Sequence, residues 1–171
     1  MSLLDEHLNN APWPRKGDVL FKSDNDWSNN ACLNFLHSSQ ELYLYAHGYK
    51  QAADILVDHI SATKRDQDIL VYPIVFLYRH CIELYLKEII TEGNILLDEP
   101  KEMPTGHKID VLWKDCKIIL EKLQFDSTKD ELEAVDEIIS QFSEKDPLSF
   151  AFRYPTDKKG EKLLPDIKYI N

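Results

Sequence analysis

The chain has 171 residues, of which 43% are hydrophobic and 29% are charged, and this composition excludes a disordered or collagen-like chain. Its 30 Asp and Glu residues against 20 Lys and Arg residues give a formal net charge of −10, which argues against a strong general nucleic-acid-binding surface. The longest apolar stretch, residues 69–78, is much shorter than the roughly 20 residues that a membrane span needs. We therefore expect one domain over residues 1–171, cytoplasmic and without a membrane partner.

The N-terminal segment, residues 1–26, is expected to be irregular. It contains Pro12 and Pro14, and its polar run 23–26 lacks the glycine and the glutamate of an EF-hand calcium loop, so we expect that run to form a turn or a helix cap. The first helix is predicted over residues 39–63, because apolar side chains recur there at three- and four-residue spacing.

The second helix is predicted over residues 67–92. Residues 69–78 are apolar on every side of this helix, so we expect them to be the most buried part of the fold. Pro73 either kinks the helix or marks its first turn. Gly93 and Asn94 are typical of a helix C-terminus and predict that the helix stops there.

Two further helices and then a change of period follow. One helix begins near Thr105 and carries a clear apolar stripe, and another begins at Thr128, which forms a capping-box pattern with the glutamate three residues later. Apolar and polar residues alternate over 149–154, which is typical of an extended strand, and residues 156–160 have the composition of a turn. We expect an all-α bundle of four or five helices, with an extended arm or short hairpin over 146–171.

Charged residues gather on one face of the second predicted helix. Arg79, Glu83 and Lys87 follow one another at intervals of four residues, and His80 lies three residues before Glu83, so all four share a helix face. They form either a polar patch at the floor of a cleft or a ladder of ion pairs that closes the exposed end of the helix. The sequence leaves both interpretations open.

His107 is a further candidate, because it follows Gly106 at the predicted start of the third helix. Backbone N–H groups at a helix N-terminus attract anions, so a phosphate or carboxylate could bind there with a neutral imidazole as hydrogen-bonding partner. The alternative is an ordinary surface or capping histidine.

Arg153 is the one charged residue in the alternating stretch 149–154. Lys158, Lys159 and Lys162 follow it and make residues 153–162 locally positive. This basic stretch is either an anion-binding arm that folds over the helical patch, or a solvated turn with one anchoring arginine.

Metal and cofactor chemistry is not expected. A site could be imagined from His47, His80 and His107, one on each predicted helix, but nothing in their spacing requires it. The chain also has no glycine-rich phosphate loop, no G-x-S-x-G elbow and no H-E-x-x-H motif. We therefore predict neither a metal nor a cofactor.

The stretch FLYRHCIELYLK at residues 76–87, followed by Gly106-His107-Lys108 and a helix with leucine and tryptophan, resembles HEPN-like helical domains, including those associated with minimal nucleotidyltransferases. The resemblance covers residues 67–124. It implies an all-α bundle, a tendency to form homodimers and a nucleotide- or RNA-linked context. Many members of that family are metal-independent endoribonucleases, whose motif is an arginine followed by a histidine after four to six intervening residues. None of the four arginines of this chain has a histidine at that spacing.

We therefore expect a HEPN-like, non-catalytic binding module for a nucleotide or an RNA end. The residues expected to contact that ligand are Arg79, His80, Glu83, Lys87, His107 and Arg153. One alternative is an atypical metal-independent ribonuclease or related hydrolase that uses His80 and His107 as acid and base. Another is a purely structural homodimer formed through the apolar second helix.

Overall fold

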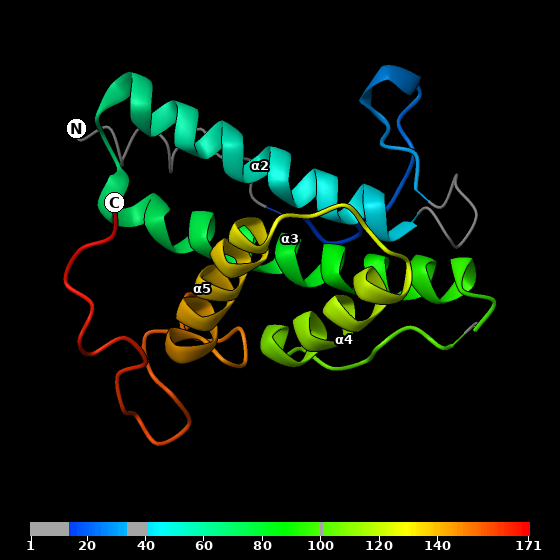
Figure 1. Ribbon diagram of the computed structural model, residues 1–171. Coiled ribbons are helices and arrows are strands. Elements are labelled where there is room, and N and C mark those ends of the chain that lie inside the picture. Colours follow the sequence, from blue (N-terminus) through cyan, green and yellow to red (C-terminus); the bar gives the residue numbers. More distant parts are fainter. Residues whose placement is uncertain (1–13, 34–40, 100) are drawn as a thin grey trace. The chain divides into compact units, whose positions relative to one another are not determined.

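The computed structural model describes residues 14–33, 41–99 and 101–171. It divides into two units, residues 1–35 and 36–171, which are described separately here. The described residues form four α-helices, one short 3-10 helix and no strand, which confirms the all-α class (Figure 1). Residues 1–13 of the predicted irregular segment and the predicted helix start at residue 39 lie outside the described residues.

In the first unit, short polar side chains hold the backbone. The 3-10 helix η1 (Trp27–Asn29) follows Asp26, whose carboxylate accepts a hydrogen bond from the Ser28 N–H at 3.1 Å. The Asp24 N–H donates to the Asn30 side chain at 2.6 Å. The polar run 23–26 therefore has the capping and turn role that its sequence predicts.

Helices α2 (Glu41–Thr63) and α3 (Gln67–Leu96) form an antiparallel pair and lie side by side along most of their length (Figure 1). The turn between them uses left-handed backbone at Lys64 and Asp66. The buried residues of α2 are the small Ala46 and Ala53, which allow α3 to approach closely. α3 continues through Pro73, which lies in its second turn.

Helices α4 (Ile109–Lys122) and α5 (Lys129–Lys145) lie on the other side of α3 from α2 (Figure 1). The main core joins Leu86 and Ile90 of α3 to Trp113 and Cys116 of α4 and Ile139 of α5. This core contains most of the closely packed apolar side chains of the second unit, so α3 is the central helix.

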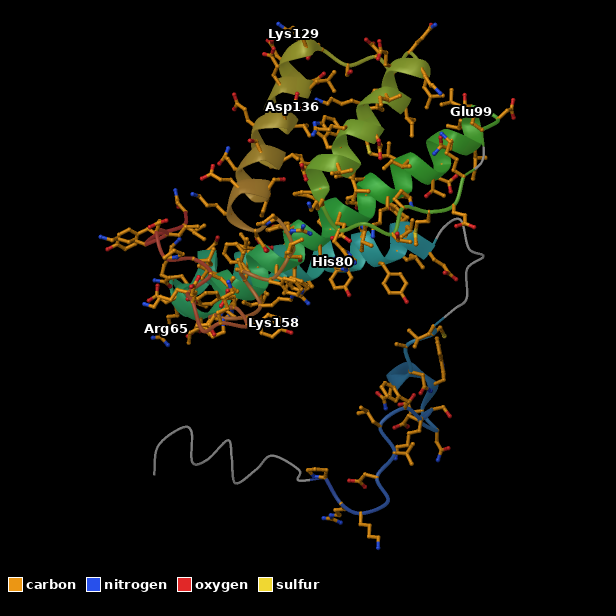
Figure 2. The ribbon with its side chains drawn as sticks, turned by 90° about the horizontal axis from the view of Figure 1, so that it is seen from below. Arg65, His80, Glu99, Lys129, Asp136 and Lys158 are labelled. Carbon is orange, nitrogen blue, oxygen red and sulfur yellow. The ribbon has the colours of Figure 1, made fainter. Side chains whose placement is uncertain are left out.

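Polar contacts fix α5 against α4. The carboxylate of Asp136 accepts hydrogen bonds from Trp113 Nε1 and Lys117 Nζ, each at 2.7 Å, and Figure 2 shows Asp136 on the side of α5 that faces α4. Thr128 caps α5 through the reciprocal hydrogen bonds with Glu131 that define a capping box. The predicted capping box is therefore confirmed.

Two predicted helix ends are wrong. α3 runs on past Gly93 and Asn94 to Leu96, because both residues are buried in the core rather than at a helix end. A Cβ on Gly93 would overlap Cγ2 of Ile119, so this glycine permits the close approach of α4. α4 begins at Ile109 and not near residue 105, since Lys108 directly before it has extended rather than helical backbone.

The burial along α3 is the reverse of the prediction. In the apolar stretch 69–78, Ile69 is 69% exposed and Tyr72 is 51% exposed, whereas the buried residues of α3 begin at Arg79 and end at Asn94. The physical reason is coverage, because α4 packs on the second half of α3 only. α3 also contains an 18-residue window with a mean hydropathy of 1.4, so it has the length and composition of a membrane span as well as those of a central bundle helix.

The C-terminal segment, residues 146–171, folds as turns. The N–H groups of Arg153 and Tyr154 donate to the Phe150 carbonyl at 3.0 and 3.1 Å, so the predicted strand over 149–154 is wrong. Thr156 and Lys162 form one antiparallel bridge around a turn, which is the expected short hairpin. The tail then runs back toward the N-terminal end of α3 (Figure 1).

Candidate functional site

The charged face of α3 forms a buried cluster. Arg79 is 0% exposed, and its Nη1 donates to Glu83 Oε2 at 2.8 Å. Its Nη2 donates to the His107 carbonyl at 2.8 Å and its Nε to the Asp146 carbonyl at 3.4 Å. One guanidinium therefore joins α3 to the segment before α4 and to the end of α5.

The other oxygen of Glu83 binds two more side chains. Oε1 lies 2.8 Å from His107 Nδ1 and 3.1 Å from Lys87 Nζ. Burial alone would raise the pKa of Glu83, but the hydrogen bonds from His107, Lys87 and Arg79 outweigh it and lower that pKa. Because an ionised carboxylate only accepts hydrogen bonds, Nδ1 of His107 carries the proton and Nε2 holds the lone pair in the neutral ring.

These contacts bear on the two interpretations of the charged face of α3, a polar patch in a cleft and a ladder of ion pairs at an exposed helix end. The ladder of ion pairs from Arg79 to Lys87 exists, but it is buried rather than at an exposed helix end. Arg79 has no surface left for a ligand, and its donors bind protein acceptors. His107, in contrast, has a side chain that is 67% exposed.

Asp146 is the member of the cluster that the sequence analysis missed. It is buried, and Oδ1 accepts hydrogen bonds from the N–H groups of Phe150 and Ala151 at 2.7 and 3.0 Å. Its Oδ2 lies 4.0 Å from Arg79 Nε. No local pattern could have found this contact, because 67 residues separate Arg79 from Asp146.

His80 lies in a different environment. Its ring packs edge-on against Tyr49 of α2, with 4.6 Å between the ring centroids, and it stacks on Phe76 at 5.8 Å. Burial lowers the pKa of His80, so its neutral form is favoured. Among the described residues, no hydrogen bond joins it to the buried cluster, and Figure 2 places it midway along α3.

Arg153 stacks on aromatic rings. Its guanidinium lies 4.8 Å from the ring centroid of Phe150, 5.5 Å from that of Phe76 and 5.6 Å from that of Tyr154. Its Nε donates to the Ser149 carbonyl at 2.6 Å. Four of the six predicted ligand-binding residues therefore share the buried cluster, while His80 and Arg153 both pack against Phe76.

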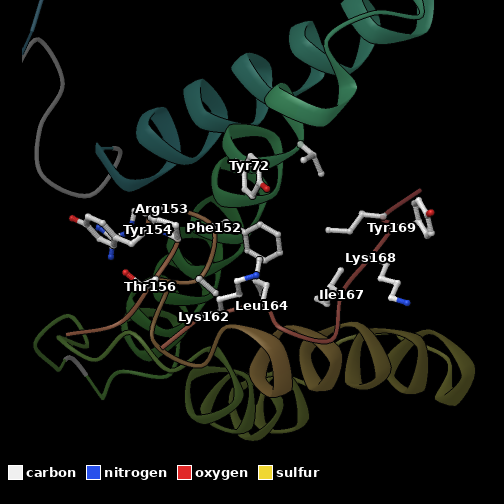
Figure 3. Close-up of a pocket in the computed structure, with 14 residues that line it drawn as sticks. Tyr72, Phe152, Arg153, Tyr154, Thr156, Lys162, Leu164, Ile167, Lys168 and Tyr169 are labelled. Carbon is white, nitrogen blue, oxygen red and sulfur yellow. The ribbon is translucent and has the colours of Figure 1, made fainter. Parts of the chain in front are cut away.

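A pocket of about 670 Å³ lies between the first half of α3 and the C-terminal segment (Figure 3). Its charged lining side chains are Arg153, Lys162 and Lys168, and in the described part of the chain no carboxylate lines it. Its aromatic lining residues are Tyr72, Phe152, Tyr154 and Tyr169. The sequence signal for this site is the locally basic stretch 153–162, for which the sequence leaves both an anion-binding arm and a solvated turn open; no sequence signal indicates the second wall from the first half of α3.

The labelled side chains have distinct places in the pocket. Figure 3 shows Phe152 and Lys162 near its centre, with Tyr72 on the α3 side. Arg153 lies beside Tyr154 at one end. The amino group of Lys168 points away from the centre at the other end. Lys162 is therefore the cation best placed to meet a ligand inside the pocket.

The described residues contain no group of three or more His, Cys, Asp or Glu side chains that could hold a metal ion. The three histidines considered from the sequence are not brought together. His47 stacks on Tyr43, His80 packs between Tyr49 and Phe76, and His107 binds Glu83.

Comparisons with protein-family models, with curated proteins and with solved structures found no match to this chain. The resemblance of residues 67–124 to HEPN-like domains therefore rests on the sequence pattern alone.

Proposed function

We propose that this chain is a HEPN-like, non-catalytic binding module that holds a nucleotide or the end of an RNA strand. The observation that carries the proposal is the pocket, which gathers three cationic and four aromatic side chains, with no carboxylate among its described lining residues, in a chain of net charge −10. Cations bind phosphate, and aromatic faces stack on nucleic-acid bases. A local positive site on an acidic protein also concentrates anionic ligands there.

The buried cluster supports the pocket in this proposal. Arg79 binds the carbonyl of Asp146, and the carboxylate of Asp146 caps the turn that begins at Phe150. That turn carries Phe152 and Arg153, which line the pocket. Arg79 and Glu83 are thus positioning residues, and Lys162 and Arg153 contact the ligand.

The test is a binding titration of the full chain with nucleoside monophosphates and short single-stranded RNAs, read by thermal shift. Lys162→Ala should weaken binding about tenfold or more, because it removes the central cation. Lys158→Ala is the matched control, since Lys158 carries the same charge, lies four residues away in an exposed turn and does not line the pocket. Absence of binding to every probe, or equal losses in the two variants, would overturn the proposal.

A second candidate function is hydrolysis, and the contact between Glu83 and His107 favours it. A buried carboxylate that fixes the tautomer of an exposed imidazole is the arrangement of a general base. The wild type should then cleave RNA, and His107→Gln should not. Lys162→Ala should cleave RNA as fast as the wild type, which would show that the pocket is not involved. Unchanged RNA after incubation with the wild type would exclude this function for the RNAs used.

A third candidate is association with a second copy of the chain. The apolar first half of α3 is the interface expected from the sequence, and its Ile69 is 69% exposed. Light scattering after size exclusion should then give twice the chain mass of 20.0 kDa, and Ile69→Glu should return the monomer. A monomeric wild type at all concentrations would exclude this candidate.

A further inference from the structure

We infer that the pocket takes a single nucleotide rather than an RNA strand, and that it binds the phosphate and the base ring without distinguishing among the bases. This inference rests on the proposed function and narrows it. Three features carry it: the dimensions of the pocket, the charge around it and the kinds of polar group that line it.

The dimensions fit one small molecule. A volume of about 670 Å³ lies within the range of roughly 300 to 1,000 Å³ that is typical of small-molecule sites. Proteins that bind single strands instead present a long basic groove that follows the backbone over several nucleotides. Its described lining residues come only from the first half of α3 and the C-terminal segment, whose side chains surround the space in Figure 3, so the site is local.

The charge distribution of the chain disfavours the binding of an RNA strand. The pocket contains three of the 20 cationic residues, and the rest of the chain is more negative than the total of −10. Outside the pocket, Lys158 and Lys159 lie in the adjoining turn, and the other 15 cations of the chain are outnumbered by its 30 Asp and Glu residues. Because strand binding gains its affinity from the number of neutralised phosphates, a longer RNA gains little beyond those two lysines.

The lining groups explain the expected tolerance for different bases. Bases are told apart by paired hydrogen bonds from Asn, Gln, Arg or acidic side chains to the base edges. No Asn, Gln, Asp or Glu is among the described lining residues, and Arg153 is held beside Tyr154 at one end by its bond to the Ser149 carbonyl. What remains for the base is the set of exposed aromatic rings, Tyr72, Tyr154 and Tyr169, and stacking accepts every base. Figure 3 shows Tyr154 and Tyr169 at the two ends of the pocket and Tyr72 nearer to Lys162, so Tyr72 is the ring best placed to stack on the base of a nucleotide whose phosphate binds Lys162.

The phosphate would bind Lys162. Its amino group lies near Phe152 in the centre of the pocket, across from Tyr72. A nucleotide can therefore place its base against Tyr72 and its phosphate on Lys162. Loss of either contact should weaken binding while leaving the other in place, so the two residues report on different parts of the ligand.

The experiment is a calorimetric titration of the full chain with adenosine 5′-monophosphate, uridine 5′-monophosphate, ribose 5-phosphate and a single-stranded RNA of about eight nucleotides. The two nucleotides should bind within about threefold of each other, and ribose 5-phosphate about tenfold or more weakly, because it lacks the stacking ring. The RNA should bind no more tightly than the nucleotides. Tyr72→Ala should reduce the preference for nucleotides over ribose 5-phosphate, whereas Tyr45→Ala, an exposed tyrosine outside the pocket, should not.

The outcomes separate the inference from the proposed function. Tight binding of the RNA with weak binding of both nucleotides would overturn the inference and leave the proposed function standing. Equal binding of ribose 5-phosphate and the nucleotides, or strong discrimination between the two nucleotides, would also overturn it. If no probe bound, both the inference and the proposed function would be wrong.

Discussion

The two halves of α3 reverse the usual relation between residue type and burial. The first half, residues 69–78, is apolar in sequence, yet Ile69 and Tyr72 are more than half exposed. The second half is charged in sequence, yet Arg79 and Glu83 are fully buried. The difference follows from what covers each half, since the core formed with α4 and α5 lies against the second half. Buried charges persist there because each has a hydrogen-bonded partner.

The two halves of α3 also have different roles in our proposal, because one half stabilises the fold and the other lines the pocket. The charged half of α3 fixes the start of α4 and the end of α5 through Arg79 and Glu83. The apolar half supplies Tyr72 and Val71 to one wall of the pocket. In our proposal, therefore, the half with the charged motif holds the fold in place, and the half with the apolar motif faces the ligand.

The largest expected effect comes from Arg79→Ala. It would leave Oε2 of Glu83 and the His107 carbonyl without a donor in the interior, and breaking one side of a buried ion pair typically costs about 3–5 kcal/mol. Urea unfolding of the wild type and the variant measures this loss. Lys50→Ala is the matched control, because Lys50 and Asp54 form an ion pair of the same i,i+4 spacing on the surface. Similar losses in the two variants would contradict the structural role assigned to the buried cluster.

A smaller effect is expected from protonating Glu83, since the carboxyl group then stays in place. The pKa of Glu83 in the folded protein is lower than its ordinary value of 4.5. Its stabilising contribution is therefore present above that ordinary value and is lost as the pH falls through the lower folded pKa. The free energy of unfolding should decrease on acidification below that ordinary value, and Glu83→Gln should flatten this part of the profile. An unchanged acid slope in Glu83→Gln would show that other carboxyl groups cause it.

The regular parts of this fold can be predicted from local sequence. Helical periodicity locates α2 to α5, the capping box at Thr128 fixes the start of α5, and the four-residue spacing predicts the pairs of Glu83 with Arg79 and Lys87. Each of these features involves residues within four positions of one another. Local spacing determines such contacts, so they need no knowledge of the tertiary fold.

Local sequence predicts neither the burial of the charged cluster around Arg79 nor the existence of the pocket. Arg79 is buried because it binds the carbonyls of His107 and Asp146, which lie 28 and 67 residues away. The pocket likewise combines Tyr72 with Phe152 and Lys162, whose side chains meet only because the C-terminal segment returns to α3. The continuation of α3 past Gly93 also depends on a distant residue, Ile119.

The close approach of α4 to α3 at Gly93 can be tested by adding a methyl group there. Gly93→Ala would place a methyl group against Cγ2 of Ile119, and overpacking of this kind typically costs about 1–3 kcal/mol. Gly48→Ala is the control, because Gly48 lies in α2 with nothing within 4 Å of the added methyl group. Alanine is the better helix former, so this variant should be more stable by about 0.5–1 kcal/mol. If urea unfolding showed that Gly93→Ala and Gly48→Ala change the free energy of unfolding in the same direction, α4 would not approach α3 closely at Gly93.

The smallest expected effect tests the exposed half of α3 directly. Ile69→Gln replaces an apolar side chain that is mostly exposed, so the free energy of unfolding should change by no more than about 0.5 kcal/mol. Ile90→Ala, in the buried half of the same helix, should cost about 2–5 kcal/mol. Ile69 does not line the pocket, so nucleotide binding should also be unchanged in Ile69→Gln. If Ile69→Gln instead lost as much stability as Ile90→Ala, Ile69 would be covered in solution. A loss that grew with protein concentration would identify the cover as a second copy of the chain, and the two halves of α3 would then both be buried, one within the chain and one between chains.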